Sequence, residues 1–291
     1  AYLHNHQNIQ HMCYVPLHLV MITFIYDKSN EDNTPLPKTE TEVYNLFTRM
    51  SLVRYYAKIG KDIVLNDLQQ LPSPELAIFL SISKLAYKIT AASKTSISMQ
   101  DINNEFLVSD IANLGIIVVG KKEGLSGGTP ILSFVHLTNQ EFLAAYHLST
   151  LPSDEQIKAI SEHISELHMG VVLKFFCGIT KLKNPDNWTA ILDSALIKDS
   201  FNKRVNLRAL QCVFESQNGQ RSRELFSNAG GELCIENDTL TLLDYCVVGY
   251  CLESASDIVK SISLRCQLTA EGLEIIVQKL TKSMECVKAL Q

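Results

Sequence analysis

Apolar residues recur at helical spacing along most of this chain, and only two short internal runs have the composition of β-strands. The amphipathic run Ile9–Ile22 predicts that residues 1–26 are helical, with Pro16 at a kink or in the first turn of a helix. The stretch Asp27–Lys38 is polar and contains two prolines, which predicts an exposed linker. Because residue 1 falls inside a helical pattern, we expect the chain to be a fragment of a longer protein.

Three further helices are predicted before residue 115. The first begins at Thr39–Glu42. The second begins after Ser73, the expected capping residue, with Pro74 at the first helical position, and the third runs from about Ser98 to Leu114. The expected core positions of the first two are Val43, Leu46, Phe47, Met50, Val53 or Arg54, Leu76, Phe79, Leu80, Ser83, Leu85 and Ala86.

The two strand-like runs are Ile116–Val119 and Ile131–Val135. Gly120–Pro130, which contains four glycines, joins them and predicts a hairpin loop. From Ser153 onward the whole pattern predicts helix, and since no fixed period is visible it favours an irregular bundle over a solenoid. The expected helices are Glu155–Leu167, His168–Lys181, Asn187–Lys198 and Val205–Gln217, followed by a loop at Asn218–Arg221.

The second strand-like run leads directly into a helix with strong start signals. Thr138 and Glu141 have the spacing of a capping box, and Leu137 and Phe142 that of a hydrophobic staple. His136 therefore stands at the mouth of a helix N-terminus, where the macrodipole and the free N–H groups favour an anion. Without further information, a histidine bonded to a backbone carbonyl at a strand end is the commoner interpretation.

This stretch, Ser133–Ala145, resembles the F-x-H-L-[ST]-x-Q-E-[FY]-x-A-A signature that closes the winged-helix domain of NACHT, leucine-rich-repeat (NOD-like) receptors. In that family the matching histidine donates a hydrogen bond to the β-phosphate of ADP. Cys13–Leu17 resembles the family's C-x-x-P-L, whose proline lies against the adenine. The resemblance thus implies nucleotide contacts for His136 and Pro16.

Further matches follow in the family's order. Met169–Gly178, Leu210–Gln217 and Leu242–Tyr245 resemble its second helical domain, and Ile262–Ile276 looks like one leucine-rich repeat that lacks one residue before Cys266. One repeat cannot bury its own apolar face, so it is expected to be a first or capping repeat.

The expected fold is mainly α: a winged-helix domain of helices plus a β-hairpin, then an irregular helical bundle and one leucine-rich-repeat-like unit. The expected segments are residues 1–28 as the end of a first helical domain, 39–150 as the winged helix, 151–255 as a second helical domain and 256–291 as the start of leucine-rich repeats.

Composition and residue spacing argue against binding to nucleic acid, membranes or zinc. The formal net charge of −5 gives no general attraction to nucleic acid or anionic lipid. The longest apolar run, Val15–Ile25, falls short of the ~20 residues that a bilayer requires. The eight cysteines have no C-x-x-C spacing and predict reduced, mostly buried thiols. A zinc site from His11, Cys13 and His18 is disfavoured, because on one helix these residues point in different directions.

No G-x-x-x-x-G-K-[ST] phosphate loop occurs, so the chain itself is not expected to be an enzyme, although its parent receptor would be a P-loop ATPase of the NACHT type. The resemblance implies the autoinhibitory, ADP-sensing region of a cytoplasmic receptor of innate immunity. Its expected partners are an upstream nucleotide-binding domain that shares ADP or ATP with it, further copies on activation, and an unknown ligand of the repeats.

Two alternatives remain. One is a helical scaffold with no nucleotide role. The other is a winged-helix DNA-binding protein, which is disfavoured because Ser96–Gly120, the segment that would enter the major groove, carries Asp101, Glu105 and Asp110 but no Lys or Arg.

Overall fold

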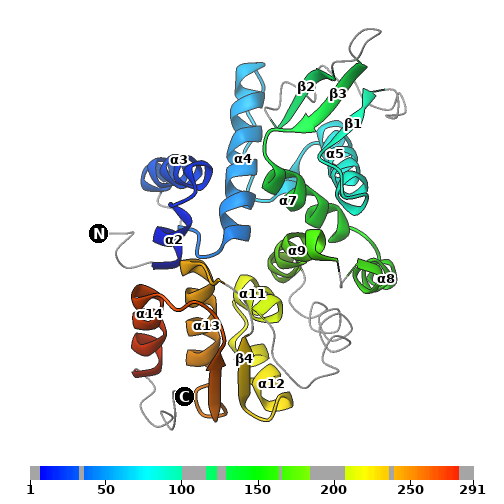
Figure 1. Cartoon of the computed structure of the whole chain (residues 1–291). Coiled ribbons are helices and arrows are strands. Elements are labelled where there is room, and N and C mark those ends of the chain that lie inside the picture. Colours follow the sequence, from blue (N-terminus) through cyan, green and yellow to red (C-terminus); the bar gives the residue numbers. More distant parts are fainter. Residues whose placement is uncertain are drawn as a thin grey trace. The chain divides into compact units, whose positions relative to one another are not determined.

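Helices predominate in the computed structural model, which describes residues 7–32, 36–99, 116–122, 129–163, 166–183, 207–235 and 239–281 (Figure 1). The chain divides into two compact units. One comprises residues 41–176, and the other comprises residues 1–40 together with 177–291. These units cut across the four segments expected from the sequence, whose boundaries stay a prediction.

The unit of residues 41–176 combines helices with one small sheet. Its helices are α4 (Glu40–Lys58), α5 (Ser73–Ala91), α7 (Leu137–Leu148), α8 (Ser153–His163) and the first part of α9 (Gly170–Lys183), with short 3₁₀ turns at Leu68–Gln70 and Leu167–Met169. Its strands are β1 (Ser96–Ser98), β2 (Ile117–Lys122) and β3 (Thr129–Phe134).

The sheet confirms the predicted hairpin and adds a third strand. β2 and β3 pair antiparallel with Ile117 opposite Phe134, and β1 pairs antiparallel with the other edge of β3. The strands reach further into the predicted loop than expected, because main-chain pairing extends to Lys122 and Thr129. Ser98, the expected start of a third helix, lies in β1, and the part of that helix from residue 100 onward falls outside the described residues.

The predicted apolar stripe of helix α4 is confirmed only at its start. Val43 is fully buried as predicted, but from Tyr44 onward the buried positions are Tyr44, Thr48, Leu52 and Tyr56, four residues apart, whereas Leu46, Phe47, Met50 and Val53 are half-buried. The Tyr44 ring lies 5.9 Å from that of Phe142 and 5.2 Å from that of Phe175, and those two rings are 5.6 Å apart. Such aromatic pairs contribute about 0.5–1.5 kcal/mol each beyond their buried area.

Two predicted details at helix ends are wrong. Ser73 does not cap α5: it is the first helical residue, Pro72 precedes it, and no side chain closes this end. Part of the predicted linker is helical, because α3 (Pro16–Asp32) continues through Asp27–Asp32, a stretch that contains neither proline nor glycine to stop it.

The other unit contains α2 (Gln7–Met12), α3 and the last part of α9, followed by α11 (Leu207–Ser216), α12 (Gly219–Asn228), β4 (Glu232–Ile235), α13 (Leu242–Ser254), β5 (Ser261–Leu264) and α14 (Ala270–Thr281). The predicted loop at 218–221 is instead the start of α12, where the Asn218 side chain accepts the Arg221 N–H at 3.1 Å as an N-cap. The expected helix Asn187–Lys198 lies outside the described residues.

Strands β4 and β5 correct two further expectations. They pair in parallel, with Leu233 opposite Ile262 and Ile235 opposite Leu264, and each is followed by a helix. The predicted strand–helix unit near the end of the chain is therefore the second of two, and the region after Ser153 is not entirely helical. A 28-residue step relates α13 to α14 and places Val247, Val248 and Leu252 in register with Ile275, Ile276 and Leu280, all of them buried.

Gly272 lets α14 approach α13 closely. A Cβ on Gly272 would lie 2.3 Å from Cε2 of Tyr245, whose side chain is fully buried. The Tyr245 hydroxyl donates to the Gln267 carbonyl at 3.4 Å and accepts the Thr269 N–H at 3.3 Å, so two hydrogen bonds hold the hydroxyl end of the ring. The ring cannot move aside without breaking these bonds.

We expect Gly272→Ala to lower the free energy of unfolding by roughly 1–3 kcal/mol, the usual cost of overpacking a core. Gly249→Ala is the matched control: its Cβ would meet Cγ of the aliphatic Lys279 side chain at 3.0 Å and Cγ2 of Ile275 at an ordinary 3.8 Å, and no aromatic ring. Equilibrium urea unfolding of both variants tests this, and equal effects would show that the Tyr245 ring is not a rigid wall.

Candidate functional site at the start of helix α7

His136 begins α7 as its capping residue. The His136 backbone is extended (φ −143°, ψ 145°), and its Nδ1 accepts the Thr138 N–H at 3.2 Å. This bond satisfies one of the N–H groups that the first helical turn leaves without a partner. The imidazole thus performs locally the work expected of a serine or threonine.

The predicted capping box and staple are therefore wrong. With the helix starting at Leu137, Thr138 and Glu141 lie inside it, and Glu141 is buried. Leu137 is 49% exposed while Phe142 is 1% exposed, so the two do not form a staple. The error arises because histidine is an uncommon cap, whereas threonine with glutamate three residues later is a common one.

The cap fixes which ring nitrogen of His136 can act on a ligand. A neutral imidazole that accepts at Nδ1 carries its proton on Nε2. The His136 side chain is exposed, so this Nε2–H is available as a donor at the mouth of the helix. An anion placed there would meet both the donor and the positive end of the α7 dipole.

Pro16 is the first residue of α3 and is exposed. Its fixed φ suits a first helical position, where no N–H is needed, so the local interpretation of Pro16 as a helix-start residue is confirmed. His136 and Pro16 belong to different compact units and are described separately.

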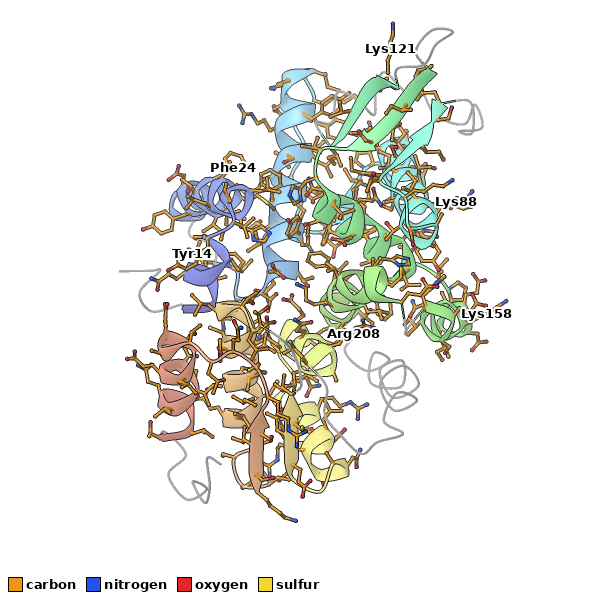
Figure 2. The ribbon with its side chains drawn as sticks, in the orientation of Figure 1. Tyr14, Phe24, Lys88, Lys121, Lys158 and Arg208 are labelled. Atoms are coloured by element: carbon orange, nitrogen blue, oxygen red, sulfur yellow. The ribbon has the colours of Figure 1, made fainter. Side chains whose placement is uncertain are left out.

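Around Pro16, helix α3 and the turn before it expose an unusual number of large apolar side chains. Isolated exposed apolar residues are ordinary, but several on one short segment indicate a surface that a partner covers. Tyr14, labelled in Figure 2, is 67% exposed. The others are Val15, Leu19, Val20 and Tyr26.

His18 lies on the buried side of α3, in a polar cluster that the sequence did not indicate. Its Nδ1 is 4.0 Å from a Glu40 carboxylate oxygen, and the Glu40 backbone N–H donates to the Glu215 carboxylate at 3.3 Å. All three side chains are nearly fully buried. Within the described part of the chain, no group of three histidine, cysteine or acidic residues is arranged to hold a metal ion.

The seven cysteines of the described residues are thiols, four of them buried. Burial raises the pKa of Cys246 and of Cys251 to about 12, and a hydrogen bond with Cys212 together with burial raises the pKa of Cys177 well above its ordinary value. These thiols have a negligible thiolate fraction at neutral pH, which does not suit a nucleophile.

Gln140, the glutamine of the family-like signature, has a structural role. It is 1% exposed, and its side-chain amide donates to Thr90 Oγ1 at 2.9 Å and to the Lys94 carbonyl at 3.0 Å. These bonds fasten the first turns of α7 to the end of α5. They fix the position of the helix that His136 begins.

No family model matches the chain, and no curated protein matches it. In the described ranges, none of the helices has both the length and the apolar character needed to cross a bilayer.

The His136 cap can be tested by stability alone. We expect His136→Ala to cost roughly 0.5–2 kcal/mol in the free energy of unfolding, because a first-turn N–H loses its partner. His136→Asn retains a good capping oxygen and should unfold at the wild-type urea concentration or above. If both variants unfold like the wild type, the bond between Thr138 N–H and His136 Nδ1 does not contribute to stability.

Proposed function

We propose that this chain is the regulatory region of a NACHT-type, leucine-rich-repeat receptor, and that His136 donates a hydrogen bond to the β-phosphate of an ADP held by a nucleotide-binding domain elsewhere in the receptor. The observation that carries this proposal is the geometry of His136: an exposed ring whose Nδ1 is occupied by the helix cap, which leaves Nε2–H as a donor.

The size of such an interaction suits a switch. A hydrogen bond to a charged acceptor contributes about 1.5–3 kcal/mol. If it exists only in the closed, ADP-bound state, it favours that state by roughly tenfold or more, since 1.4 kcal/mol corresponds to a factor of ten. The chain performs no catalytic step in this proposal, because the phosphate loop and the hydrolytic residues would belong to the nucleotide-binding domain.

The exposed apolar residues Tyr14, Val15, Leu19, Val20 and Tyr26 support a partner domain on the same side of α3 as Pro16. In this proposal that partner is the nucleotide-binding domain, and Pro16 lies against the adenine. The receptor would be cytoplasmic and would self-associate once ADP is released.

The parallel pair of strand–helix units supports a leucine-rich-repeat start, through which a ligand would be sensed. The described sheet β1-β3-β2 with α4 and α5 before its hairpin supports a winged helix. The segment that would read DNA lies mostly outside the described residues, and its three carboxylates keep DNA binding an unfavoured alternative.

The proposal gives the two nitrogens of His136 separate roles: Nδ1 caps the helix and Nε2–H donates to ADP. A longer chain that restores the upstream nucleotide-binding domain can test them separately. His136→Asn keeps the helix cap but removes the ring donor, so it should lose ADP about tenfold faster or more and should self-associate more, without loss of stability. ADP release can be followed with a fluorescent analogue, and self-association by light scattering.

Unchanged ADP release in His136→Asn would show that His136 takes no part in the switch. If the longer chain still retains ADP after deletion of residues 1–291, these residues are better interpreted as a helical scaffold. A direct check is the coding sequence upstream of Ala1, which should contain a G-x-x-x-x-G-K-[ST] loop.

A further inference from the structure

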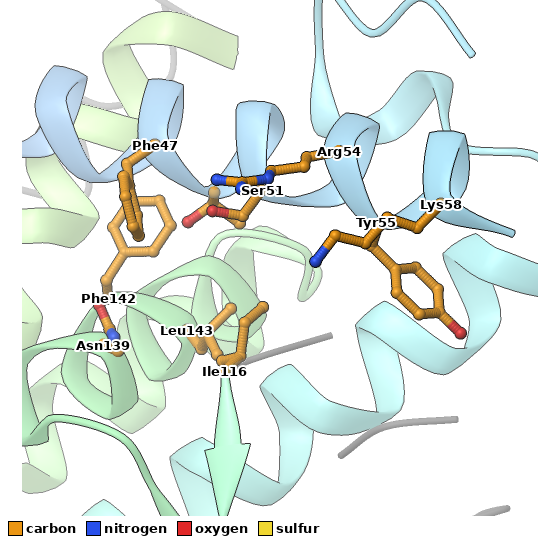
Figure 3. Close-up of a pocket in the computed structure, with 10 residues that line it drawn as sticks. Phe47, Ser51, Arg54, Tyr55, Lys58, Ile116, Asn139, Phe142 and Leu143 are labelled. Atoms are coloured by element: carbon orange, nitrogen blue, oxygen red, sulfur yellow. The ribbon is translucent and has the colours of Figure 1, made fainter. Parts of the chain in front are cut away.

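A cavity of about 350 Å³ lies between α4 and α7 in the unit of residues 41–176 (Figure 3). This volume is within the size range of sites that hold small molecules, roughly 300–1,000 Å³. Its walls come mostly from one face of α4 and the first two turns of α7. His136, although it begins α7, does not line it.

Two cations extend over one part of this cavity. Arg54 and Lys58 are four residues apart on α4 and therefore project from the same face of the helix, as Figure 3 shows. Within the described residues, no hydrogen bond or ion pair joins either side chain to an acceptor. Nearby cations are different: Lys61 pairs with Glu75 at 2.8 Å, and Arg49 donates twice to the Leu65 carbonyl.

A neutral polar group adds a donor beside the two cations. Ser51 contributes a hydroxyl next to the Arg54 guanidinium, whereas Asn139, in the first turn of α7, lies beside Phe142 (Figure 3). The two cations and the hydroxyl favour a negatively charged group, and no described carboxylate lines the cavity.

The other part of the cavity is apolar. Phe47 from α4 and Phe142 from α7 lie close together there (Figure 3). The lining also includes Leu143, Ile116, Thr48 and Tyr55. Aromatic walls of this kind bind the flat face of a ring. The cavity thus combines a cationic part with an aromatic part. Small-molecule sites are typically apolar with a few convergent polar groups of this kind.

We propose that this cavity binds a small molecule in which a monophosphate is joined to a flat aromatic group, the chemical class of a nucleoside monophosphate. Arg54 and Lys58 hold the phosphate, Ser51 donates to one of its oxygens, and Phe47 lies against the ring. Arg54 suits the role because its planar guanidinium binds phosphate through two parallel bonds. The site is separate from the contact proposed for His136.

Adenosine monophosphate is the probe for this site, and titration calorimetry of the 291-residue chain at low ionic strength is the measurement. We expect a Kd below about 1 mM. Adenosine lacks the anion and inorganic phosphate lacks the ring, so each should bind at least about tenfold more weakly. Arg54→Gln combined with Lys58→Gln should weaken adenosine monophosphate by a similar factor.

Lys94→Gln combined with Lys121→Gln is the matched control, since it removes the same charge from exposed positions outside the cavity. Thermal unfolding of each variant checks that it is folded. No binding of adenosine monophosphate, equal binding of adenosine, or equal loss in both double variants would overturn the proposal. His136→Asn should leave this binding unchanged, so the two proposals can fail independently.

Discussion

The packing of α7 against α5 is the constraint on which the unit of residues 41–176 depends. Eight of the twelve residues of α7 are buried, which leaves it without the wide polar face of a surface helix. Ala144 and Ala145 permit close approach, Phe142 and Tyr146 fill the space beside them, and Gln140 supplies the polar tie to α5. A helix held in this way cannot rotate to suit a ligand, so whatever its first turn presents is preorganised.

This rigidity connects the two proposed sites. His136 stands before α7 as an exposed residue whose Nδ1 caps the helix, while Asn139, Phe142 and Leu143 in the first two turns line a cavity. The histidine that resembles a nucleotide sensor is also the residue that stabilises the start of the helix. A substitution that destroys both roles cannot separate them, whereas asparagine keeps one and removes the other.

Helices and strands could be predicted from the sequence where the hydrophobic pattern extends over many residues. Predictions of helix ends and short strands failed where two local conformations have similar free energies. The hairpin and the helices around 43–58 and 73–91 followed from periodicity, because many residues contribute to each. β1 and β4 are only three and four residues long, and their partners lie far along the chain, so nothing local marks them. The His136 site was visible as a motif, but the cap inside it was not. The cavity was not visible, because Arg54 and Lys58 look like an ordinary solvated face until α7 is placed opposite them.

The contact between Gly272 and Tyr245 fixes the order of the two strand–helix units. At the step of 28 residues, the position of Gly272 corresponds to Asp244, which closes the start of its own helix by bonding Thr241. A second copy of the first unit in place of the second would bring a carboxylate against the tyrosine ring. Despite their common spacing, the two units are thus not interchangeable, and each fits only its own place in the order of the chain.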